Sequence, residues 1–124
     1  MSLDDRSLVA AVRELAAENP DYVYKNQGGQ QAGGGTSCFY VHDVGGKLCG
    51  GCLIGQGAIR AGEPIADVAA WDNADVADAQ SVLPDSLSDR VRAWAFQVQV
   101  KQDIGWAWGA AVKYADEIEG DPLD

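Results

Sequence analysis

The chain of 124 residues has the size of one folded domain, and its hydrophobic content of 47% is that of a globular protein rather than a disordered one. Nineteen acidic residues against nine basic ones give a net charge of −10, which argues against DNA or RNA binding, because that binding depends on Lys and Arg replacing the counterions of the phosphates. No run approaches the roughly 20 apolar residues that a membrane-spanning helix needs, and the charged stretch 1–19 lacks the pattern of a signal peptide. We therefore expect a cytoplasmic protein without a membrane segment.

Apolar residues at helical spacing predict a first helix over residues 4–18. Ser2 or Asp4 is a suitable N-terminal cap, and Pro20 ends the helical run. The stripe itself consists of Leu8, Val12 and Leu15. Residues Asp21–Tyr24, which are aromatic or β-branched at three positions, predict a short strand.

Residues 26–35 hold five glycines and three glutamines, a composition that cannot pack and that predicts a mobile connecting loop. A glycine-rich loop can bind phosphate through its backbone N–H groups. This one lacks the Lys-Ser/Thr ending of a phosphate-binding P-loop, and no helix start follows it. We therefore predict that it does not bind a nucleotide.

Residues 36–42 alternate in the manner of a β-strand, and residues 47–51 return as a second strand. The four residues between them, 43–46, have the Asp-Val-Gly-Gly composition of a turn. Together they predict an antiparallel β-hairpin. A helix over residues 53–61 is expected to follow and to pack nearby, with Gly62 as its C-cap.

The C-terminal half of the chain predicts helices. Residues 62–84 indicate one or two short helical turns, and Ser86 or Ser88 can cap a long helix after them. A second apolar stripe begins near Gly105, so a bend or break is expected there. The sequence thus predicts one α+β domain over residues 1–124, with an N-terminal helix, a small antiparallel sheet containing a central β-hairpin, and a mostly helical C-terminal half.

Acidic residues are concentrated in two segments. Residues 61–89 contain seven acids and no base, and residues 114–124 contain five acids and no base, ending in an acidic tail at 119–124. We interpret them as a solvated face and a solvated tail. The alternative is an acidic surface that docks on a basic partner or mimics nucleic acid.

The three cysteines and the only histidine lie within fifteen residues, at Cys38, His42, Cys49 and Cys52. Their C-x3-H-x6-C-x2-C spacing offers four zinc-type ligands. In a regular strand, however, the Cα atoms of Cys38 and His42 would lie about 13 Å apart, which is too far for two ligands of one zinc ion. We therefore predict no metal and no cofactor, and keep a small zinc-stabilised domain as the alternative.

Cys49 and Cys52 also form a C-x2-C pair ahead of a predicted helix, where a helix N-terminus lowers the pKa of a thiol. The alternating strands and helices of a thioredoxin-like protein are missing from the sequence. The simpler interpretation is that Cys38 and Cys52 are small buried apolar residues.

Catalytic machinery is not recognisable in the sequence. His42 would have to serve any histidine-dependent site, no G-x-S-x-G nucleophile motif is present, and the carboxylates show no paired spacing. We therefore favour a non-enzymatic protein over a thiol-dependent enzyme.

Trp106 is the candidate anchor of a protein interface. It lies about 200° around a helix from Trp108, which belongs to an apolar stripe, so Trp106 falls off that stripe. Together with the neighbouring Gln102 and Asp103 it combines polar groups with an aromatic side chain, as interfaces do. Two alternatives stay open: the polar pair serves as helix caps or buried hydrogen-bonding groups, and Trp106 covers the loop around Trp71.

Five short segments carry a family resemblance: Tyr24, Cys38-Phe-Tyr40, Cys52-Leu-Ile-Gly55, Gln102-Asp-Ile-Gly105 and Trp108-Gly-Ala-Ala111-Val112. In these segments the chain resembles a set of small uncharacterised proteins of actinomycetes and of the bacteriophages that infect them. The resemblance implies a phage or prophage accessory protein with no established activity. With the sequence features above, it leads us to expect a protein that acts by binding another protein, or a second copy of itself, in the cytoplasm of a bacterial host.

Overall fold

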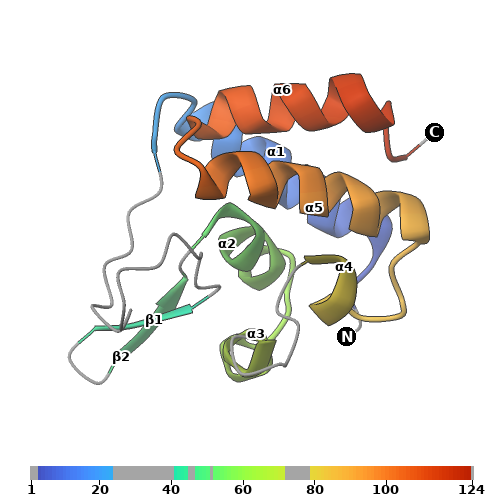
Figure 1. The fold of residues 1–124 in the computed structure, drawn as a ribbon. Coiled ribbons are helices and arrows are strands. Elements are labelled where there is room, and N and C mark those ends of the chain that lie inside the picture. Colours follow the sequence, from blue (N-terminus) through green and yellow to red (C-terminus); the bar gives the residue numbers. More distant parts are fainter. Residues whose placement is uncertain (1–2, 24–40, 45–46, 51, 72–78, 124) are drawn as a thin grey trace.

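The computed structural model describes residues 3–23, 41–44, 47–50, 52–71 and 79–123. In chain order the elements are α1 (Asp5–Glu18), β1 (Val41–Val44), β2 (Lys47–Gly50), α2 (Leu53–Arg60), α3 (Ile65–Trp71), α4 (Ala79–Val82), α5 (Asp89–Asp103) and α6 (Trp108–Glu119). Figure 1 shows α5 and α6 as an antiparallel pair, with α1 behind them and α2 below them. The helices α1 and α2 also contact each other directly, which closes the bundle.

The predicted α+β fold is wrong, because the described residues form a mostly helical protein. β1 and β2 pair antiparallel, with Val41 opposite Gly50 and Val44 opposite Lys47, and the described residues contain no larger sheet. Two strands of four residues are too few to make a sheet that supports helices, so the fold depends on helix packing instead. Most of the predicted strand 36–42, like the predicted loop 26–35, lies outside the described residues.

The short strand expected at Asp21–Tyr24 is also not a regular strand. Pro20 and Asp21 lie in a turn after α1, and Val23 makes a single antiparallel bridge to Ala107. Tyr24 lies outside the described residues. Within the described residues of this segment, only Val23 is paired, although the side chains are those of a strand.

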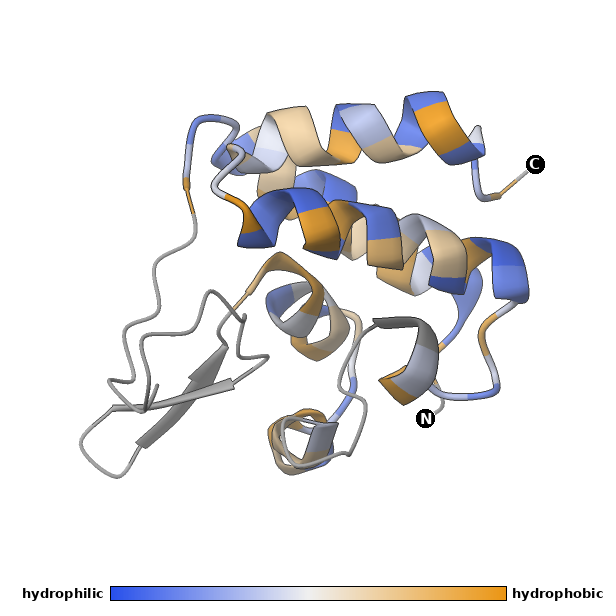
Figure 2. Cartoon of the chain, in the orientation of Figure 1, coloured by the Kyte–Doolittle hydropathy of each residue, from blue (hydrophilic) through white to orange (hydrophobic). Residues whose placement is uncertain are grey.

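The core is formed by the apolar faces of the helices (Figure 2). Its largest fully buried side chain is Trp94 of α5, which no solvent reaches. Around it lie buried residues from other helices, including Leu8, Val12, Ile54 and Trp108. Burying one large apolar side chain of this kind contributes about 1.5–3 kcal/mol, so this cluster supplies most of the force that holds the bundle together.

The predicted helix boundaries agree closely with the structure in four places. Asp4 caps α1, and Ser88 caps α5 by accepting a hydrogen bond from the backbone N–H of Val91 at 3.2 Å. The helix predicted over residues 53–61 is α2, followed by Gly62 with a positive φ of 112°. The predicted break between the last two helices occurs at Gly105, where φ is 102° and a side chain would strain the backbone.

A carboxylate joins three of the helices. Asp116 Oδ1 of α6 accepts hydrogen bonds from Arg13 of α1 at 2.8 Å and from the Trp94 indole of α5 at 2.9 Å. The Arg13 guanidinium also lies 5.6 Å from the centroid of the Trp94 ring. Asp121 lies 3.6 Å from the same guanidinium. Two acids of the C-terminal segment therefore pair with Arg13 at the partly exposed edge of the bundle.

Candidate functional site

The turn between α5 and α6 brings four side chains together on the surface. We call these residues, Lys101, Ile104, Trp106 and Tyr114, the aromatic corner. The backbone N–H of Trp106 donates to the carbonyl of Lys101 at 3.0 Å, so the chain folds back over the last turn of α5. The positive φ of Gly105 permits this reversal.

Trp106 is held at the surface by its neighbours. Its side chain is 38% exposed, and its ring meets the Tyr114 ring edge-on, with centroids 5.5 Å apart and planes at 75°. Lys101 Nζ lies 4.8 Å from the centroid of Trp106 and 4.4 Å from that of Tyr114. Both contacts are attractive, so the Trp106 ring has a fixed position while remaining open to solvent.

Further apolar side chains are exposed in the same turn and in the turn after α1. Ile104 is 63% exposed, and the turn after α1 adds Tyr22 and Val23, which are 37% and 39% exposed. This turn is fixed beside the corner by the bridge between Val23 and Ala107 and by a hydrogen bond from Trp108 N to Tyr22 O at 2.9 Å. Figure 1 shows the turn following α1 next to the start of α6. The described surface here thus combines several exposed apolar side chains from three parts of the chain.

The predicted site residues Gln102 and Asp103 take different positions. Gln102 is only 2% exposed, and its side-chain carbonyl accepts hydrogen bonds from Leu53 N at 2.7 Å and from the Trp108 indole at 3.1 Å. Its amide donates to Asp103 Oδ1 at 3.2 Å, and Asp103 is half-buried. Gln102 is therefore a buried hydrogen-bonding group, as the alternative interpretation had it, and Trp106 is the most exposed of the three predicted site residues.

Of the three cysteines and the histidine, only Cys52 has a side chain that the structure describes. Cys52 is fully buried in the core just before α2, which agrees with its interpretation as a small apolar residue and leaves it out of reach of a redox partner. The backbone of His42 lies opposite that of Cys49 in the ribbon, and Cys38 lies outside the described residues. Among the side chains that the structure describes, no group of three metal ligands forms. The four-ligand zinc hypothesis therefore stays untested.

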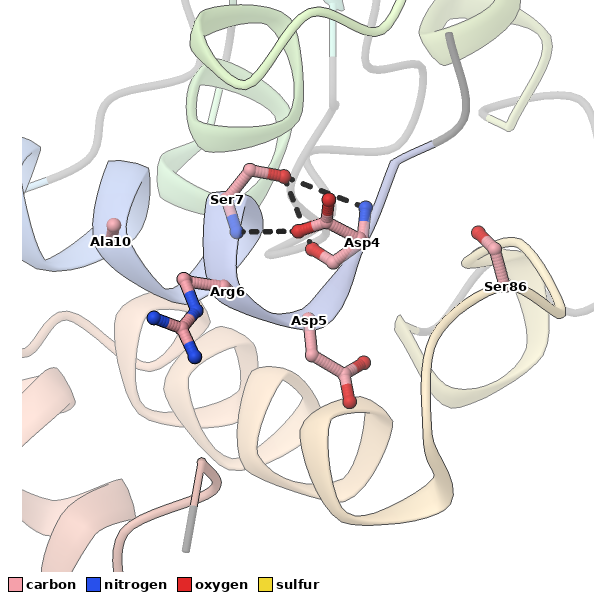
Figure 3. Close-up of a pocket in the computed structure, with 6 residues that line it drawn as sticks. All are labelled: Asp4, Asp5, Arg6, Ser7, Ala10 and Ser86. Atoms are coloured by element: carbon pink, nitrogen blue, oxygen red, sulfur yellow. Dashed lines mark hydrogen bonds between the residues drawn. The ribbon is translucent and has the colours of Figure 1, made fainter.

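The surface pockets contain polar groups that hold the chain together. One open pocket of about 580 Å³ is lined by Asp4, Asp5, Arg6, Ser7, Ala10 and Ser86. Figure 3 shows the Asp4 carboxylate turned toward Ser7. The carboxylate accepts a hydrogen bond from the backbone N–H of Ser7 at 2.8 Å. Asp5 accepts a hydrogen bond from Ser88 N, also at 2.8 Å. The backbone and hydroxyl groups of Ser7 lower the pKa of Asp4, so its carboxylate is suited to capping α1 rather than to donating a proton.

Comparisons with known proteins give no match: neither the protein-family models, nor the curated proteins, nor the solved structures contain one that is similar enough to count. In the part of the chain that the structure describes, no helix is both long enough and apolar enough to cross a membrane.

The sequence indicated Trp106 but not its neighbours in the aromatic corner. Lys101 and Tyr114 are thirteen positions apart, and only the reversal at Gly105 brings them together. One signal was available: Tyr114 lies off the apolar stripe that Trp108 and Ala111 begin, as Trp106 does. Trp106 itself lies in the turn before α6, so this signal concerns Tyr114 alone and does not show that the two rings meet.

Proposed function

We propose that this protein is a non-enzymatic binding module that contacts another protein through the aromatic corner. The observation that carries the proposal is the exposed Trp106 ring, fixed between Lys101 and Tyr114. Tryptophan and tyrosine are enriched among residues that dominate binding energy, and a ring that is already held in place loses little entropy on binding.

The net charge supports a basic partner. With a charge of −10 the protein attracts positively charged surfaces and repels nucleic acid, so electrostatic steering favours basic proteins. The resemblance to proteins of actinomycetes and their phages adds a setting: we propose a phage or prophage accessory protein that works in the bacterial cytoplasm. A partner from the host or from the phage is consistent with that setting.

Site-specific photo-cross-linking tests this function. A photoreactive residue at position 104, which is exposed beside Trp106, is expected to give a discrete protein adduct in an actinomycete lysate. The same residue at position 10, exposed on α1 outside the corner, is the control and is expected to give none of that adduct. Trp106→Ala is expected to abolish the adduct.

The mass of the adduct identifies the partner class. An adduct of twice the mass of the chain would show that the partner is a second copy. Adducts that are equal at positions 10 and 104, or that survive Trp106→Ala, would contradict the proposed function.

A further inference from the structure

Lys101 of α5 places its ammonium group against two aromatic rings at once. Its Nζ lies 4.8 Å from the Trp106 centroid and 4.4 Å from the Tyr114 centroid. The two rings meet at 75°, so they present two walls to the same cation. We propose that this ring pair is a binding seat for a lysine or arginine side chain of a basic partner segment, and that Lys101 occupies the seat in the free protein. The inference rests on the proposed function.

The rings favour a cation over other groups. The face of an aromatic ring is electron-rich, and tryptophan gives the strongest cation–π attraction of the natural side chains. Because Lys101 has a long stem with many rotamers, holding it in place costs conformational entropy, and this cost is recovered when it leaves. Trp106 and Tyr114 also contact each other edge-on, and this contact does not involve Lys101. A partner's side chain can therefore replace Lys101 without rebuilding the site.

The surroundings also attract positive charge. Glu117 is exposed one turn after Tyr114 on α6, and the last turn of α6 contains no basic residue. α6 contains one basic residue, Lys113, which is exposed, and the cation–ring contacts recorded among the described residues are those of Arg13 and Lys101. The whole chain carries a net charge of −10. This environment complements a basic segment and opposes an acidic one.

The inference predicts that Lys101→Met raises the affinity of the protein for an added cation. Methionine keeps an apolar stem that can still cover the rings but removes the charge, so the rings no longer hold a cation of the protein's own. The probe is N-acetyl-arginine amide, titrated into the ¹⁵N-labelled full-length protein while the backbone amide resonances of residues 101–114 are followed. We expect Lys101→Met to bind the probe at least about twofold more tightly than the wild type, the low end of what an exposed cation–π contact is worth.

Lys113→Met is the matched control, because it makes the same change in net charge away from the rings. It is expected to gain much less affinity than Lys101→Met. Adding Trp106→Ala to Lys101→Met is expected to remove the gain. Equal gains for the two lysine variants, weaker binding by Lys101→Met, or a gain that survives Trp106→Ala would overturn the inference.

This test is separate from the test of the proposed function. If Lys101→Met gives no gain while Trp106→Ala still abolishes the cross-link at position 104, the cation seat is wrong and the binding surface stands. If the cross-link is unaffected by Trp106→Ala while the cation gain is observed, the seat binds cations but the proposed function is wrong.

Discussion

The side chain of Gln102 in α5 caps the N-terminus of α2, because its carbonyl accepts a hydrogen bond at 2.7 Å from the backbone N–H of Leu53. Cys52, at the N-cap position, makes no side-chain cap of its own. The same Gln102 oxygen accepts the Trp108 indole N–H, so one buried atom joins α2, α5 and the start of α6. This bond positions the end of α5 from which the aromatic corner begins.

Gln102→Ala is expected to lower the free energy of unfolding by about 1–3 kcal/mol, because it leaves two buried N–H donors without their acceptor. Urea denaturation measures this loss. Gln97→Ala is the control on the same helix: Gln97 is half-buried and donates one longer bond, 3.3 Å, to Glu119. A loss for Gln102→Ala no larger than that for Gln97→Ala would show that the cap is dispensable.

Close packing of α1 against α2 depends on Gly57. A Cβ at this position would lie 2.6 Å from Val12 Cγ2, and Val12 is fully buried with a stiff β-branched side chain. Gly57→Ala is therefore expected to cost about 1–3 kcal/mol of stability through overpacking. In a Val12→Ala background the same substitution should cost less, since the clashing methyl is gone. Equal costs in the two backgrounds would place the effect of Gly57 elsewhere.

The cap of α1 makes stability depend on pH. Hydrogen bonds from the backbone and hydroxyl of Ser7 lower the pKa of Asp4 in the folded protein. A carboxyl whose pKa is lowered by folding stabilises the folded state above its unfolded pKa and loses that contribution as the pH falls through its folded pKa. Asp4→Asn retains a capping oxygen but cannot titrate.

The wild type is therefore expected to be more stable than Asp4→Asn at neutral pH, and this advantage should shrink as the pH is lowered to about 2. Urea midpoints of the two proteins across this range measure it, and the other carboxylates cancel because both proteins contain them. An advantage that is constant with pH, or that grows in acid, would contradict the assignment.

The helices could be predicted from the sequence because their signals are local. The stripe beginning at Leu8, the cap at Ser88 and the break at Gly105 each involve residues within a few positions of one another. The sheet was overestimated for the opposite reason: alternation shows that a segment can form a strand but does not supply the partners that a sheet needs. Here the paired strands are four residues long and the helices pack on one another instead.

Only the exposure of Trp106 was predicted correctly in the candidate site, and for a different reason. The sequence separated Trp106 from the core stripe by a helical angle from Trp108, whereas Trp106 lies in the turn between α5 and α6, where it is partly exposed. The burial of Gln102 depends on a helix that begins 49 residues earlier, which no local pattern reveals. A polar residue beside a glycine bend looks the same in the sequence whether it faces a partner or caps a distant helix.

The measurement that tests the central claim most directly compares Trp106→Ala with Trp108→Ala in urea denaturation. If Trp106 serves recognition, its replacement loses the edge contact with Tyr114, the contact with Lys101 and the covered part of a side chain that is 38% exposed, about 1–2 kcal/mol. Trp108 is 2% exposed, so Trp108→Ala empties part of the core and should cost about 3–5 kcal/mol. A loss for Trp106→Ala as large as that for Trp108→Ala would make Trp106 a structural residue and would contradict the assignment of the aromatic corner as a binding surface.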